Sequence, residues 1–285
     1  MYHRAGGSGE WVRVGPKRKD LDAEVQEAEA ENGSADDVAL RPGANADSQA
    51  DVDRYISLRV RSLYDVYSYR HAAAILANSF PGELKEIERA LDEFRITMRE
   101  IGTPGGNESD MPRKFSRVLR PAGWVETRLQ GDLLVRAKEY AEEFLDGGKT
   151  RKVKRAEVEP RLVENFIDGH KIDYVKGRVA FDMEWNSKDQ TFDRDLYALR
   201  AFHECGIISL GVLVTRSASL NPVFAVAPRF DKDGKQIRGE TVRAKYGAST
   251  TWMGKLLYRL NAGRHGGCPV LVFGITPKLI TDWKT

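Results

Sequence analysis

The chain has 285 residues, room for one large domain or two small ones, and its 45 Lys and Arg against 42 Asp and Glu give a formal net charge of +3. Its two cysteines, Cys205 and Cys268, are too few for a disulfide framework or a thiolate metal site. No apolar run approaches the roughly twenty residues that cross a membrane, and the N-terminus lacks the apolar segment of a signal peptide. We therefore expect a cytoplasmic protein without a membrane anchor.

The first fifty residues differ in composition from the rest. Between residues 20 and 50, nine acidic side chains stand against the single Arg41, and large apolar side chains are scarce. Such a segment buries too little to fold alone, so residues 1–50 are predicted to be a disordered acidic leader and residues 51–285 a single domain. Without the leader the remainder is distinctly basic, which favours an anionic partner.

Helical spacing of apolar residues follows the leader. Residues 71–80 and 82–96 are predicted to be helices, the second with a core stripe from Leu84 to Phe94. Residues 103–115 are rich in turn formers and are expected to be a connector, with Arg113 and Lys114 as possible phosphate contacts. Residues 131–148 are predicted to be a helix, and the basic run Lys149–Arg155 that follows suits a phosphodiester backbone.

The central stretch is Val179–Asn186, VAFDMEWN, which alternates as a strand does. Its apolar residues point to one face and Ala180, Asp182, Glu184 and Asn186 to the other. If Lys176-Gly177 forms a two-residue turn, Asp173 on the preceding strand faces Ala180 and shares the acidic face. Three converging carboxylates are how a protein holds a hard divalent cation.

The rest of the chain predicts an α/β core with a mixed central sheet flanked by helices. Residues 191–206 have helical spacing, and residues 207–215 and 268–276 are predicted to be buried strands. Two polar segments could contact DNA bases or phosphates: one after the first buried strand and one before the next helix. Their candidate side chains are Arg216, Ser217, Ser219, Asn221, Ser249, Thr250, Thr251 and Lys255. A plain helix N-cap is the alternative for Ser249–Thr251.

At HKIDYVKGRVAFDMEWNSKDQTFDRDLYALRAFHECGIISLGVLVTR the sequence resembles restriction endonucleases of the BglII type. KYGASTTWMGKLLYRLNAGRHGGCPVLVFGI resembles a later block of that family, and the likeness runs from about Tyr55 to Thr276. It implies a restriction-endonuclease-like PD-(D/E)xK core and a homodimer on palindromic duplex DNA with Mg²⁺-dependent cleavage. By position, Asp173 and Glu184 are the acidic ligands and Asn186 stands where the superfamily has lysine. Asp182 also departs from the family pattern, which is usually apolar there.

The chemistry of these residues supports the same reaction. Mg²⁺ held by Asp173, Glu184 and the carbonyl of Trp185 would activate a water and neutralise the phosphate, leaving 5′-phosphate ends. Asn186 could position the nucleophile but could not take its proton. Lys188 would share the acidic face if the strand ran that far, and could accept the proton. Base contacts are expected from Lys188, Asp189 and Gln190, beside the second loop Arg216–Asn221.

Three functions remain open at this stage. The first is a type II restriction endonuclease paired with a cognate DNA methyltransferase. The second is a nuclease of the same fold with a repair or structure-specific task. The third is a DNA-binding module that has lost catalysis, which Asn186 keeps open.

Overall fold

The computed structural model describes residues 2–4, 11–13, 43, 45–104, 110–247 and 249–283. Most of the predicted acidic leader lies outside these residues. Its described end is ordered: Ser48 caps a helix through the backbone N–H of Asp51, and the Asp47 carboxylate accepts a hydrogen bond from Ser68 at 2.5 Å. This helix, Gln49–Tyr55, crosses the predicted boundary at residue 50.

The elements follow one another through the chain as a mixture of helices and strands. The strands are β1 (Tyr2–Arg4), β2 (Trp11–Arg13), β3 (Tyr64–Tyr69), β4 (Val125–Val135), β5 (Lys138–Leu145), β6 (Lys149–Glu157), β7 (Arg161–Lys176), β8 (Val179–Glu184), β9 (Leu210–Arg216), β10 (Pro228–Phe230), β11 (Gln236–Thr241) and β12 (Val270–Ile275). The α-helices are α2 (Gln49–Tyr55), α3 (Leu58–Arg61), α4 (Ala72–Ser79), α5 (Pro81–Glu93), α6 (Met98–Gly102), α7 (Asp110–Leu119), α8 (Thr191–Glu204), α9 (Asn221–Val226), α10 (Val242–Tyr246) and α11 (Met253–Asn261).

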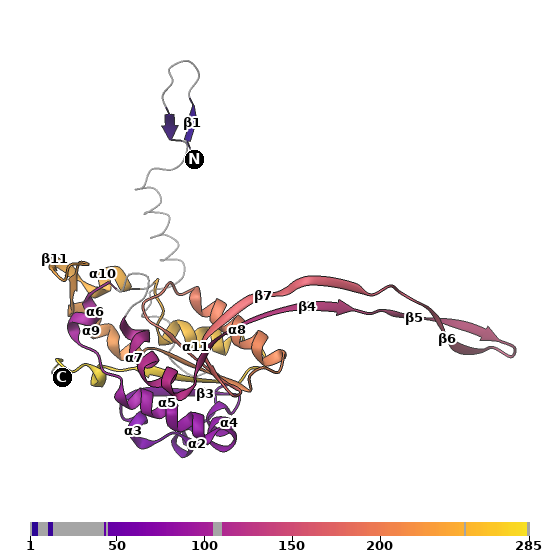
Figure 1. Cartoon of the computed structure of the whole chain (residues 1–285), viewed down its shortest axis with the longest axis horizontal. Coiled ribbons are helices and arrows are strands. Elements are labelled where there is room, and N and C mark those ends of the chain that lie inside the picture. The colour runs from indigo at the N-terminus through magenta and orange to yellow at the C-terminus, as the bar shows by residue number, and fades with distance from the viewer. Residues whose placement is uncertain are drawn as a thin grey trace.

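A six-stranded mixed sheet in the order β3-β12-β9-β8-β7-β4 forms the centre of the molecule. β8, β9 and β12 are parallel to one another, whereas β3, β7 and β4 pair antiparallel to their neighbours. Helices lie on both faces (Figure 1), and every residue of β8, β9 and β12 is buried. The predicted mixed sheet flanked by helices is confirmed.

Two apolar clusters fill the space between the sheet and its helices. One joins Val179, Phe181 and Met183 of β8 to α5 and α7, and the other joins Ala180 to Phe192, Leu196 and their neighbours on α8 and α11. Alternate β8 residues therefore pack on opposite sides, as a strand's period of two requires. None of the described helices is long and apolar enough to cross a membrane.

The β7–β8 hairpin turns at Gly177-Arg178, one residue later than predicted. Its register pairs Tyr174 with Phe181 and Lys176 with Val179, and Gly177 takes a positive φ of 54°, which glycine adopts without a steric penalty. The shift moves the partner of each β7 residue by two positions, so each side chain keeps its face. Asp173 is directed at Asp182 instead of Ala180.

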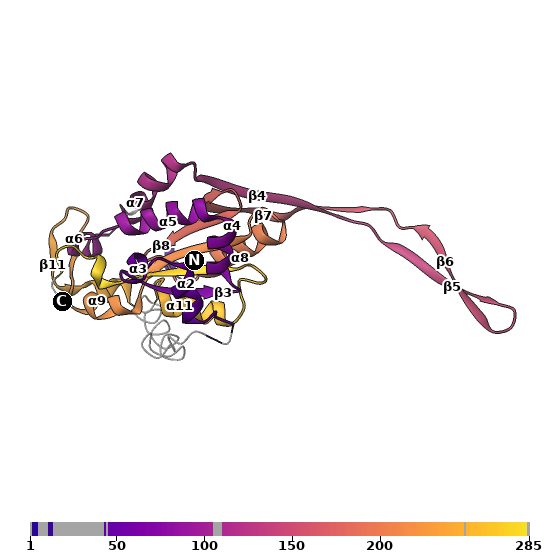
Figure 2. The same ribbon diagram turned by 90° about the horizontal axis from the view of Figure 1, so that it is seen from below.

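The predicted helix over residues 131–148 is wrong, because these residues form the end of β4 and all of β5. Together β4, β5, β6 and β7 build a two-stranded arm that projects far from the body, as both views show (Figures 1 and 2). β5 pairs with β6 and sets Glu142 opposite Lys152 and Glu143 opposite Arg151. Such opposite-charge pairs support strand pairing. The basic members of these pairs lie beyond residue 148, so the spacing within residues 131–148 could not indicate the pairing.

Candidate active site

A cleft of about 1040 Å³ opens at the end of β8. Its floor is formed by Met183, Glu184, Trp185 and Asn186, with Asp173 from β7. The β7–β8 pairing ends at Tyr174 and Phe181, so the two strands diverge where these polar groups lie. The structure thus brings four predicted site residues, Asp173, Glu184, Trp185 and Asn186, to the same cleft.

The acids at the end of β8 are buried and lie close enough to raise one another's pKa. Burial raises the pKa of Asp182 well above its usual value, and the charges of Asp173 and Glu184 raise it further. Burial also raises the pKa of Glu184, while hydrogen bonding to Ser187 and the charge of Arg194 oppose the rise. Each carboxylate makes its neighbours harder to ionise, so the group as a whole favours a bound cation.

Two residues of α8, Arg194 and Asp195, interact with these acids, and sequence analysis missed both. Arg194 Nη2 lies 3.4 Å from Glu184 Oε1 and 2.9 Å from Asp195 Oδ1. Burial raises the pKa of Asp195 well above its usual value, with the charges of Asp182 and Glu184 adding to it. Arg194 and Asp195 lie on the helix after the strand, and nothing in their local pattern indicates that they reach back to Glu184.

Asn186 has the backbone and environment of a functional residue. Its φ of 56° places it in the left-handed region, which is uncommon for a residue other than glycine. Its Oδ1 is buried and has no hydrogen-bond partner, and an unpaired buried acceptor costs free energy. Asn186 also lines the cleft beside Glu184.

The donor set fits a hard divalent cation, although not in the predicted form. Among the described residues, no three His, Cys, Asp or Glu side chains form a metal-holding group, so Asp173, Asp182 and Glu184 lie close enough to interact electrostatically but do not form a three-carboxylate site. The Asp182 carboxylate instead accepts a hydrogen bond from the N–H of Met183 at 2.8 Å. The oxygens that remain at the cleft are two carboxylates, a main-chain carbonyl and the unpaired amide oxygen of Asn186, which are the ligand types that Mg²⁺ prefers.

Lys188 does not share the acidic face. β8 ends at Glu184, and the left-handed backbone at Asn186 interrupts the alternation on which that expectation rested. Lys188 is exposed in the loop that follows. Its backbone bridges to Thr250, and the N–H of Asp189 donates to the carbonyl of Ser249 at 3.1 Å. The two predicted DNA-contacting segments, residues 188–190 and 249–251, therefore lie side by side.

Arg216 is buried instead of facing a ligand. Its guanidinium donates to the carbonyls of Thr251 and Tyr246 and to Thr250 Oγ1, and it lies 4.4 Å over the ring of Phe224. Burial lowers its pKa to about 9. Because its donors are used inside the protein, Arg216 holds the 246–251 loop and is not available for a base contact.

The remaining predicted DNA-binding residues divide by exposure. Ser217 is buried and hydrogen-bonded to Asp65, and Thr251 is buried as well, whereas Ser219 and Ser249 are exposed. Asn221 is half-buried at the start of α9. Lys255 lies 3.9 Å from Asp189. The N-cap of α11 is Trp252, so Ser249–Thr251 do not cap this helix.

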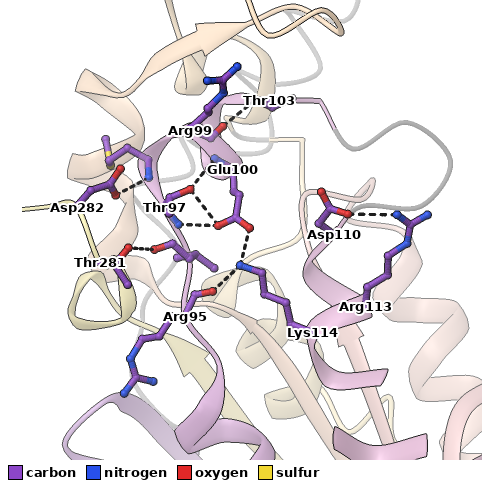
Figure 3. Close-up of polar contacts among 12 residues, drawn as sticks. Arg95, Thr97, Arg99, Glu100, Thr103, Asp110, Arg113, Lys114, Thr281 and Asp282 are labelled. Atoms are coloured by element: carbon purple, nitrogen blue, oxygen red, sulfur yellow. Dashed lines mark hydrogen bonds and ion pairs between the residues drawn. The ribbon is translucent and has the colours of Figure 1, made fainter. Parts of the chain in front are cut away.

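Residues of α6 and α7 also line the cleft, and Figure 3 shows the polar contacts that these helices make. Thr97 and Glu100 form a capping box at the start of α6, and Lys114 of α7 lies 2.5 Å from Glu100. Burial raises the pKa of Glu100, but hydrogen bonds from Lys114 and Thr97 outweigh it, and the net pKa is lowered. Lys114 thus joins the two helices, which corrects its prediction as part of a loop.

Exposed cations surround the mouth of the cleft. They come from helices and loops far apart in the sequence, which is why no run of residues predicts them, and they are Arg99, Arg120, Lys171, Lys232 and Lys245. Lys171 is paired with Glu126 at 2.7 Å, and the guanidinium of Arg120 lies 4.5 Å over the ring of Tyr174. A cationic rim around an acidic floor suits a phosphodiester with a bound cation.

A mixed sheet flanked by helices, with acids where two of its strands diverge, is a restriction-endonuclease-like fold. The chain belongs to the restriction endonuclease BglII/BglIII family, whose model matches residues 64–275. The match begins at the first residue of β3 and ends at the last residue of β12, so it spans the whole central sheet. No curated protein matches the sequence. Family membership identifies a type II restriction endonuclease that cleaves DNA site-specifically.

Proposed function

We propose that this enzyme uses Mg²⁺ to hydrolyse both strands of a short palindromic DNA site and leaves 5′-phosphate ends. The observation that carries the proposal is the unpaired Oδ1 of Asn186, buried in the cleft beside the Glu184 carboxylate. When bound there, Mg²⁺ would lower the pKa of a water and neutralise charge on the scissile phosphate.

Each residue of the cleft has a separate task in this proposal. Asp173, Glu184 and the Trp185 carbonyl hold the cation. Asn186 Oδ1 accepts a hydrogen bond from the attacking water and orients it, but a neutral amide cannot take the proton. Arg194 holds Glu184 in place through its 3.4 Å contact. Since Lys188 lies off the acidic face, the proton passes to solvent or to a phosphate oxygen.

DNA is bound through two kinds of contact. The exposed rim cations, among them Lys232 and Lys245, contact phosphates and fix the position of the duplex. The exposed side chains of the paired segments, Lys188, Gln190 and Ser249, reach base edges, and Ser219 and Asn221 at the start of α9 have the same task. A homodimer places two such clefts on the two strands, because a two-fold axis in the protein matches a palindrome. A cognate DNA methyltransferase would protect the host site.

The test is digestion of unmethylated phage DNA by the purified protein with Mg²⁺ at about 10 mM, a concentration far above typical site affinities, or with EDTA. Discrete bands that appear only with Mg²⁺, and 5′-phosphates at both ends of sequenced fragments, are the expected result. Tight duplex binding without cleavage under any divalent cation would contradict the proposal and favour the inactive binding module.

A further inference from the structure

The arm, formed by the outer parts of β4 and β7 together with β5 and β6, is too exposed to be stable as an isolated ribbon. At about 3.3 Å per residue, the strands from Leu133 to the turn at Asp146 reach about 40 Å from the sheet. Of the fifteen large hydrophobic side chains exposed among the described residues, ten lie between Val125 and Phe166. A two-stranded hairpin is marginal in water without a covering layer, so the arm requires a partner.

The charge of the arm argues for protein as that partner. The outer part, residues 136–160, carries seven basic and six acidic side chains and is nearly neutral. Its most exposed large side chains are Phe144 at 80% and Tyr140 at 61%. A duplex-binding ribbon would carry a strong excess of cations, whereas exposed aromatic residues on a neutral surface are typical of protein interfaces.

The two strands of the outer arm carry opposite charges. β5 has three acidic residues and one basic residue, while β6 has five basic residues and one acidic residue. Tyr140, Glu142 and Phe144 share one face of the ribbon with their partners Lys154, Lys152 and Thr150 on β6. Because acidic residues of β5 lie directly beside basic residues of β6, this face can pair with the same face of a second copy, provided that the symmetry places β5 over β6.

That symmetry is a two-fold axis along the length of the arm. Two ribbons stacked face to face about this axis place β5 of one copy over β6 of the other, at the same level. Since Glu142 is paired with Lys152 inside the hairpin, Glu142 then lies over Lys152 of the second copy, and Phe144 and Tyr140 are covered. An axis across the ribbon would instead place β6 over β6, with five basic residues on each side.

We propose that the Tyr140–Phe144 face of the arm stacks on the same face of a second copy of this chain, about a two-fold axis along the arm. The partner is the second subunit of the homodimer in the proposed function. Only this identity of the partner rests on the proposed function. The stacked arms form a clasp, with both catalytic bodies at the same end.

The deciding experiment mixes two charge-reversal variants of the full chain. Glu142→Lys and Lys152→Glu each place like charges over one another in the dimer, so sedimentation equilibrium should show dimerisation at least tenfold weaker for each. A 1:1 mixture should restore the dimer, because each copy then carries the charge that the other requires. The hairpin of each variant keeps its like-charge pair, so rescue cannot come from within one chain. Glu204→Lys, on the body, is the matched control and should change nothing.

A covalent test fixes the direction of the arms. Asp146→Cys at the turn, in a Cys205→Ser background, should be cross-linked between copies by a bis-maleimide that spans about 10 Å, the spacing of stacked sheets, because the two tips are adjacent. Unchanged dimerisation of both charge variants, no rescue on mixing, or a monomeric wild-type protein would overturn the inference. Dimerisation that stays constant while Lys152→Glu weakens DNA binding would assign the arm to DNA. Mg²⁺-dependent cleavage by the wild-type protein is scored separately and tests the proposed function alone.

Discussion

β8 and β5 are both strands, yet they owe their conformation to different causes. Every residue of β8 is buried between parallel β9 and antiparallel β7, with packed helices on both faces. β5 is paired on one edge only, and all but one of its residues are exposed. The first strand is stabilised by the burial of its own side chains, whereas the second depends on what covers it. The body is therefore complete in one copy of the chain, and the arm is not.

The sharpest test of the body as the seat of chemistry is Glu184→Gln. Removing this carboxylate from the cleft floor should lower the cleavage rate by about a thousandfold or more, since the held cation supplies several kcal/mol. DNA binding, measured by gel shift in Ca²⁺, should persist. Glu204→Gln, an exposed acid paired with Arg200 on α8, is the control. A parallel loss of binding would contradict the assignment of Glu184 to the cation.

The two strands can be compared directly by removing one aromatic ring from each. Phe181 of β8 is fully buried against Phe115, Trp124 and Tyr174, so Phe181→Ala should lower the free energy of unfolding by about 3–5 kcal/mol. Phe144→Ala in β5 should change the unfolding of dilute monomer by at most about 0.5 kcal/mol. Chemical denaturation at low and high protein concentration measures both. An equal loss of unfolding free energy for the two variants in dilute monomer would contradict the view that β8 and β5 are stabilised differently.

Substitution of Arg216 tests whether the loop beside the cleft needs the hydrogen bonds that this buried side chain donates to it. Arg216→Met keeps the packing on Phe224 but leaves the carbonyls of Tyr246 and Thr251 without their donor, which should cost about 1–3 kcal/mol. Cleavage should fall together with site preference, because segment 249–251 loses its anchor. Arg200→Met on the exposed face of α8 should leave both unchanged. A stable variant with normal cleavage would show that the loop keeps its conformation without the hydrogen bonds from Arg216.

Asp182→Asn should leave cleavage chemistry to the other acids and raise stability modestly, by an amount that depends on pH. Because the folded-state pKa of Asp182 is raised, the folded protein binds this proton more tightly than the unfolded chain does. Stability is therefore lost as pH rises through the unfolded value of about 3.9 towards the folded pKa. In EDTA at pH 7.5 the neutral amide should raise Tm by about 4 °C, which corresponds to about 1–2 kcal/mol. The gain should vanish below about pH 3.5, and a lower Tm at pH 7.5 would contradict it.

The parts of the fold that could be predicted are those whose pattern is local. Alternation in 179–186, helical spacing in 191–206 and the apolar run 207–215 correspond to β8, α8 and β9. The arm was not predictable in this way, because 131–145 is fixed by pairing with residues that follow it in the chain. The cationic rim was not predictable for a similar reason, since Arg99 and Lys245 line the same cleft only after the chain has folded.

Within the site, the acids were predictable from strand phase, while their surroundings were not. A turn misplaced by one residue still put Asp173 on the correct face, because the partner shifted by two. The phase argument failed at Lys188, since the left-handed backbone of Asn186 lies between it and the strand. Arg194 was missed because its contact with Glu184 joins a helix to a strand end, ten residues apart.

β7 is one strand of sixteen residues, from Arg161 in the arm to Lys176 at the turn of the central hairpin, and it carries Asp173. Displacement at its outer end acts along the same backbone that aims this carboxylate at the cleft. Gly169, with a φ of 55°, lies between the two parts and is the place where such displacement would be absorbed as bending. The surface proposed for assembly and the carboxylate of the cleft are thus parts of one continuous strand.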